Sequence, residues 1–228
     1  MLRAILIYLS KADWARRFVQ TWGIARRMAA RFVAGETQQD AIQVIENLSK
    51  KGINATLDHL GEHVVTKAVV QQAADEILAM IDHLAAQQVR AGISIKLSQI
   101  GLVLDQSLCR KLLGLIAERA KQQGIFIRSD MENSQVTEQT IAVFSQVHQA
   151  GCQDTIGIVL QSYLYRSMED LCTLLASGAK VRICKGAYKE PSEVAYPKKR
   201  DVDENFDRMT AVLLDASFKS GSTISKDG

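Results

Sequence analysis

From about residue 50 onward, short runs rich in β-branched residues alternate with longer segments of helical period. The short runs occupy residues 53–58, 93–97, 125–130, 156–161 and 180–185. Between them, apolar residues recur at intervals of three and four, as from Val69 to Leu84. This alternation predicts right-handed β-α-β crossovers and a parallel sheet. Two architectures satisfy it: an open doubly wound sheet and a closed (β/α)₈ barrel.

The loops that follow the predicted strands favour the barrel. None of them contains a glycine-rich phosphate-binding motif of the Rossmann or P-loop kind, which weakens the nucleotide-binding doubly wound interpretation. We therefore expect an α/β fold of the (β/α)₈ TIM-barrel type over residues 51–228, incomplete, with about five β-α units. Residues 1–50 are expected to form a separate N-terminal helical segment. Ser167, with Asp170 three residues later, predicts a capped helix start.

Composition excludes several classes of protein. The 228 residues are 47% hydrophobic and 23% charged, which is typical of a soluble globular protein. The net charge of +3 is too small to argue for nucleic-acid binding. The four cysteines form no C-x-x-C pair, so we expect free thiols in a reducing cytoplasm. No apolar run reaches the roughly 18 residues of a membrane span.

The N-terminal segment is basic and amphipathic. Residues 11–34 hold six basic side chains and one acid, and Trp14, Phe18 and Trp22 share one helical face. Such a helix could lie on an anionic membrane surface. The alternative, which we favour, is that the aromatic side chains pack against the main domain while the arginines face water.

Polar residues recur where the predicted strands end. Lys96, Asp130 and Gln161 close three strands, and the last strand carries Arg182 and Lys185. Because parallel strands end at the same edge, these side chains should converge at one mouth, where barrel enzymes place their active sites. An unpaired ammonium is costly to bury, which favours a functional role for Lys96. The two cations of the last strand favour an anionic partner such as a phosphate or a reduced cofactor.

The segment from Asp58 to His63 has a superficial likeness to a metal site. His59 and His63 are four residues apart, but Gly61 lies between them and favours a turn over a helix. We therefore expect no metal here.

Five motifs at these strand ends carry a family resemblance. In order they are LDHLGE at 57–62, ISIKLS at 93–98, RSDME at 128–132, GIVLQSY at 157–163 and VRICKGAY at 181–188. Together with the stretch at 189–200, they resemble the proline dehydrogenase family in its short, single-function bacterial form. The resemblance runs from about residue 50 to about residue 219.

This resemblance implies a barrel that binds FAD and oxidises L-proline to 1-pyrroline-5-carboxylate, the first step of proline degradation to glutamate. It also implies a membrane quinone as electron acceptor. With the free thiols and the basic N-terminal segment, we expect a cytoplasmic protein with peripheral contact at the inner face of the membrane. By the same resemblance, Lys96 binds the proline carboxylate, while Asp130 and Arg182 form the catalytic pair. Glu62 matches an acid that pairs with a substrate-binding arginine. The residues implied to contact FAD are Met131, Gln161, Lys185, Gly186 and Ala187.

The family pattern also contains three further strands and a late helix with a tyrosine and two adjacent arginines. Here adjacent arginines occur only at 16–17 and 26–27. We therefore expect a truncated form, poorly soluble or unstable alone, with little proline oxidation. Two alternatives stay open: an aldolase-like barrel with Lys96 or Lys185 as a Schiff-base lysine, and a non-catalytic barrel fragment that binds a complementary piece.

Overall fold

The computed structural model describes residues 37–58, 66–89 and 91–220. In these residues, five parallel strands form one sheet in the order of the sequence. They are β1 (Ala55–Asp58), β2 (Ala91–Lys96), β3 (Ile127–Asp130), β4 (Ile156–Gln161) and β5 (Lys180–Cys184). Each strand lies within two residues of its predicted bounds.

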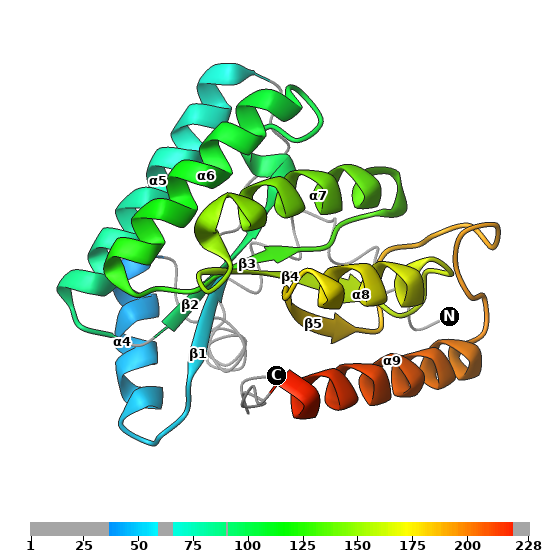
Figure 1. The fold of residues 1–228 in the computed structure, drawn as a ribbon. Coiled ribbons are helices and arrows are strands. Elements are labelled where there is room, and N and C mark those ends of the chain that lie inside the picture. Colours follow the sequence, from blue (N-terminus) through cyan, green and yellow to red (C-terminus); the bar gives the residue numbers. More distant parts are fainter. Residues whose placement is uncertain (1–36, 59–65, 90, 221–228) are drawn as a thin grey trace, which may run out of the picture.

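The strand order decides between the two predicted architectures. A doubly wound sheet reverses its strand order at a switch point and carries helices on both faces. Here neighbouring strands are always consecutive in sequence, and the connecting helices lie along the outside of the curved sheet (Figure 1). The fold is therefore an α/β barrel-like fold, as predicted, with β1 and β5 at the edges of the described sheet.

Long helices connect the strands. They are α5 (Lys67–Ala86), α6 (Gln106–Gln123), α7 (Ser134–Val147) and α8 (Ser167–Ala176), with α4 (Gln38–Ser49) before β1 and α9 (Lys199–Ser220) after β5. A short 3₁₀ helix, η1 (Leu97–Ile100), follows β2, and a π-helical turn, η2 (His148–Cys152), follows α7.

Side-chain caps start several of these helices, but the cap predicted at Ser167 is wrong. Thr66 and Asp105 accept hydrogen bonds from the backbone of α5 and α6. The N-cap of α8 is instead Arg166, which makes no side-chain cap bond. Ser167 Oγ donates to the carbonyl of Gln161 at 2.5 Å, so this hydroxyl ties the helix to the end of β4.

The sheet has one apolar face and one polar face because side chains alternate along each strand. Ile93, Ile95, Ile127 and Ile158 are fully buried and belong to the hydrophobic core that the helices cover. The intervening positions face the barrel interior and carry Lys96, Asp130 and Arg182. Packing therefore fixes the register, since a slip of one residue would bury these charges.

The predicted N-terminal segment lies mostly outside the described residues, including Trp14, Phe18 and Trp22. Its described part contains α4, whose Ile42 and Ile45 are buried in the core. No helix in the described part of the chain is long and apolar enough to cross a membrane.

Candidate active site

Strand register places Lys96, Asp130 and Arg182 in one row on the inner face. Lys96 of β2 pairs in register with Asp130 of β3, and Val159 of β4 pairs with Arg182 of β5. Continuing the register of β3 and β4 puts Asp130 beside Val159. Arg182 Nη2 reaches across Val159 and donates to Asp130 Oδ1 at 2.7 Å. Of the side chains predicted to converge, Lys96, Asp130 and Arg182 therefore lie in one row.

The Asp130 carboxyl is strongly influenced by its surroundings. Burial raises its pKa, and the charge of Asp58 adds to this, while Arg182 and Lys96 act to lower it. The net direction is upward because only 18% of the side chain reaches solvent. Burial and the nearby Arg182 lower the pKa of Arg128, two residues earlier on the same face. The site thus holds charged groups of both signs in a partly desolvated row.

Lys96 is held by an acid on the neighbouring strand. Its Nζ lies 3.3 Å from Asp58 Oδ1 and 3.4 Å from Oδ2. The Lys96 side chain is 25% exposed and that of Asp58 is 45% exposed. The ammonium is therefore oriented but reachable from solvent, which suits recognition of a carboxylate.

The connection after β5 presents Lys185, Gly186 and Ala187 on the surface. Lys185 Nζ donates to Asp203 of α9 at 2.6 Å and lies 5.3 Å from the ring centroid of Phe206. Gly186 has φ 106°, a conformation that favours glycine. A Cβ at this position would overlap the ring of Tyr163. Close packing on Tyr163 is thus sufficient reason for the glycine.

Two residues expected to contact a cofactor lie at the ends of β3 and β4. Gln161 is buried, and its Nε2 donates to the carbonyl of Glu132 at 2.7 Å. The Met131 side chain is 6% exposed and packs in the hydrophobic core. A contact from Met131 to a ligand at the mouth would therefore use its backbone.

Sequence reasoning assigned no role to one acid, Glu132, and one tyrosine, Tyr188, near these strand ends. Glu132 accepts hydrogen bonds from the backbone and hydroxyl of Ser98, at 3.1 and 2.6 Å. Burial raises the pKa of Tyr188, and the charges of Glu132 and Asp130 add to this. These residues were visible in the family motifs, but no spacing rule links residues so far apart in sequence.

The segment with His59, Glu62 and His63 lies outside the described residues. Among the residues that are described, no group of three or more potential metal ligands is found.

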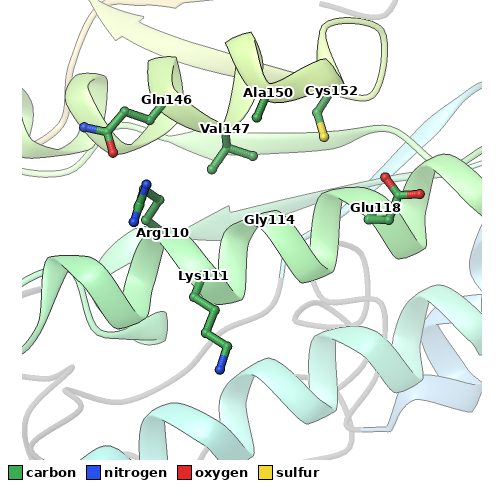
Figure 2. Close-up of a pocket in the computed structure, with 8 residues that line it drawn as sticks. All are labelled: Arg110, Lys111, Gly114, Glu118, Gln146, Val147, Ala150 and Cys152. Carbon is green, nitrogen blue, oxygen red and sulfur yellow. The ribbon is translucent and has the colours of Figure 1, made fainter.

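A groove between α6 and α7 lies away from these strand ends (Figure 2). Arg110, Lys111 and Glu118 line it from α6, and Val147 and Cys152 from the opposite side. It contains none of the strand-end residues that form the charged row, so we do not assign the reaction to it.

Comparison with known proteins identifies the family of this chain. The family profile described as proline dehydrogenase matches residues 41–224. The chain belongs to the proline dehydrogenase family. A Bacillus subtilis (strain 168) relative, "Proline dehydrogenase 1", is 34% identical over 228 residues, which are 100% of this chain and 74% of the relative. "Proline dehydrogenase" of Deinococcus radiodurans is 39% identical over 194 residues, covering 83% of this chain and 62% of the relative.

A solved structure of a larger protein shares the fold. Proline utilization A from Bdellovibrio bacteriovorus superposes with a TM-score of 0.77 at 22% identity. The match covers 84% of this chain and 25% of that chain. The chain therefore spans about a quarter of this larger protein, and the likeness confirms the barrel-like fold.

Proposed function

We propose that this chain is a flavin-dependent enzyme unit that oxidises L-proline to 1-pyrroline-5-carboxylate. The observation that carries the proposal is the row of Lys96, Asp130 and Arg182 on the inner face of the sheet, in a member of this family. The names of the curated relatives support proline as the substrate. FAD as the cofactor and a membrane quinone as the acceptor are further parts of the proposal.

The substrate would be held by its carboxylate. Lys96 is the candidate because its ammonium is oriented by Asp58 and still partly exposed. A charge-assisted hydrogen bond fixes the carboxylate, and orientation is the main requirement for transfer between two bound partners. Asp130 and Arg182 would lie beside the carbon of the proline ring that is oxidised. Their ion pair would provide a fixed electrostatic field there.

The candidates for holding a flavin nucleotide lie in β4 and β5 and directly after β5. Arg182 and Lys185 supply two cations, and Gly186 and Ala187 lie in an exposed loop that a ligand can reach. Gln161 adds an amide at the adjacent strand end. When bound, the flavin supplies the hydride acceptor. The part assigned to Arg182 is to favour negative charge near that acceptor, and the part assigned to Lys185 is to bind the nucleotide.

Lys96 supports the aldolase-like alternative less well. A Schiff-base lysine is activated by desolvation or by a neighbouring cation. Lys96 is instead held by the carboxylate of Asp58 at 3.3 Å and reaches solvent. Lys185 is likewise paired with Asp203 and half exposed. Both ammonium groups therefore already have a carboxylate partner.

The test is a single-turnover measurement with purified chain and added FAD. L-proline under anaerobic conditions should bleach the flavin absorbance and yield 1-pyrroline-5-carboxylate, while D-proline should not. If Asp130→Ala and Arg182→Met both bleach the flavin at the wild-type rate, the proposed active site is wrong. If the chain binds FAD but L-proline does not bleach it, L-proline is not the substrate.

A further inference from the structure

The connection between β5 and α9, residues 185–198, is the long irregular segment that carries Lys185, Gly186 and Ala187. Segments of this length without regular secondary structure keep one conformation only where side chains or backbone groups hold them. The contacts that hold this connection therefore decide where its three proposed ligand-binding residues lie.

Glu190 is the main side-chain anchor of the connection. Its Oε1 accepts from the backbone N–H of Ser134 at 2.7 Å, and its Oε2 accepts from Ser134 Oγ at 2.5 Å. Ser134 is the first residue of α7. A carboxylate at a helix N-terminus is stabilised by the helix dipole and by charge-assisted hydrogen bonds. The pairing spans 56 positions in sequence and joins the loop after β3 to the loop after β5.

This contact is not needed simply to start the helix. Asn133 is already the N-cap of α7, and its side chain accepts from the backbone of Gln135 at 3.2 Å. Because α7 has its own cap, the contact of Glu190 with Ser134 mainly orders the connection.

Tyr163 joins the same anchor to Gly186. Its hydroxyl donates to Glu190 Oε1 at 3.4 Å, and its backbone N–H donates to the carbonyl of Lys185 at 3.1 Å. The Tyr163 ring fills the space where a Cβ of Gly186 would lie. Glu190 and Tyr163 thus fix the connection at both ends of the Lys185–Ala187 stretch.

We propose that Glu190 is a positioning residue for the cofactor site. Its carboxylate docks the β5–α9 connection on the N-terminus of α7 and on Tyr163, and this sets where Lys185, Gly186 and Ala187 meet the ligand. The inference rests on the proposed function, since it takes these three residues as part of the flavin site.

The test compares Glu190→Ala, Glu190→Gln and Ser134→Ala with a matched control, Glu193→Ala, which removes an exposed acid of the same connection. FAD affinity is measured by quenching of flavin fluorescence in the full chain. Backbone hydrogen exchange is followed in peptides covering residues 134–138 and 185–190.

Glu190→Ala should weaken FAD binding about tenfold or more, since it removes charge-assisted hydrogen bonds to the partly buried Ser134. It should also speed exchange in both peptides. Glu190→Gln keeps an acceptor for the Ser134 N–H and should recover much of the affinity. Ser134→Ala added to Glu190→Ala should cost nothing further, because the two residues act as one unit. Glu193→Ala should match the wild type.

Two results would overturn the inference. One is unchanged exchange in both peptides of Glu190→Ala, which decides against the anchor even if the wild-type chain binds no FAD. The other is Glu190→Gln behaving no better than Glu190→Ala, which decides against positioning through Ser134. Failure of the wild-type chain to bind FAD, with exchange altered as expected, would count against the proposed cofactor and leave the anchor standing.

Discussion

Arg182 binds Asp130 across an intervening strand. The guanidinium of β5 passes over Val159 of β4 to reach the carboxylate of β3 at 2.7 Å. The ion pair therefore links the inner faces of three strands. It also keeps two groups of opposite charge at one level of the barrel interior, where a bound ligand would meet both.

Removing the guanidinium should impair the proposed reaction more than it impairs folding. We predict that Arg182→Met lowers the rate of proline-dependent flavin reduction by about 10²-fold or more, the usual effect of losing one preorganised electrostatic contact. Arg182→Lys should recover little, because an ammonium lacks the planar fork that reaches Asp130. The measurement is rapid-mixing absorbance with saturating FAD. Equal rates in Arg182→Lys and wild type would show that charge alone suffices.

The raised pKa of Asp130 predicts a pH dependence of stability. A carboxyl with a folded-state pKa above its ordinary value binds its proton more tightly in the folded chain than in the unfolded one. The free energy of unfolding therefore falls as pH rises from the ordinary value near 3.8 through the folded pKa. We predict that wild type loses stability relative to Asp130→Asn over this window, in urea unfolding at stepped pH. A difference that stays flat or grows in favour of wild type would contradict the prediction.

Two glycines offer a matched test of packing. A Cβ at Gly157 in β4 would lie 2.7 Å from the carbonyl oxygen of Lys180 and 2.7 Å from the Phe126 ring, so Gly157→Ala should cost about 1–3 kcal/mol. Gly114 lies within α6 with nothing within 4 Å of the added atom. Gly114→Ala should therefore stabilise the chain by about 0.5–1 kcal/mol. Urea unfolding of both variants checks the two signs, and a stabilising Gly157→Ala would refute the packing argument.

Most of the fold was predictable because it depends on local periodicity. The five β-branched runs predict the strands, the spacing of apolar residues between them predicts the helices, and their alternation predicts parallel pairing. The apolar side chains of each strand lie on one side, so only that side can face the core. The start of α8 was mispredicted because Ser167 satisfies a carbonyl at the end of β4 instead of its own helix. That choice depends on tertiary contact, which sequence spacing does not encode.

The site was predictable only in part, for the same reason. Lys96, Asp130 and Arg182 could be expected to converge because parallel strands end at one edge. The reach of Arg182 over Val159 and the support of Lys96 by Asp58 depend on register between strands. Glu190 could not be linked to Ser134 from the sequence, since the contact spans 56 positions.

Asp203 provides a second pH test with the opposite sign. Hydrogen bonds from Lys185 and Lys199 lower the pKa of this carboxyl. The carboxyl therefore binds its proton more tightly in the unfolded chain than in the folded chain. Its contribution to the free energy of unfolding is present above the ordinary aspartate pKa and is lost as the pH falls through the pKa of the folded state. Asp203→Asn should be less stable than wild type near neutral pH, with the gap closing in acid and in high salt. A gap that persists at acid pH would point to packing instead of charge.

The four thiols should differ sharply in reactivity. Cys109 is fully buried, and burial raises its pKa to about 12, so almost none of it is thiolate at neutral pH. Burial also raises the pKa of Cys152 and Cys184. Cys172 is exposed on α8. We predict that iodoacetamide labels Cys172 within minutes in the native chain and leaves Cys109 untouched until urea is added, as read by mass spectrometry of the peptides. Labelling of Cys109 at the rate of Cys172 in native buffer would mean that η1 and α6 open freely at this edge of the core.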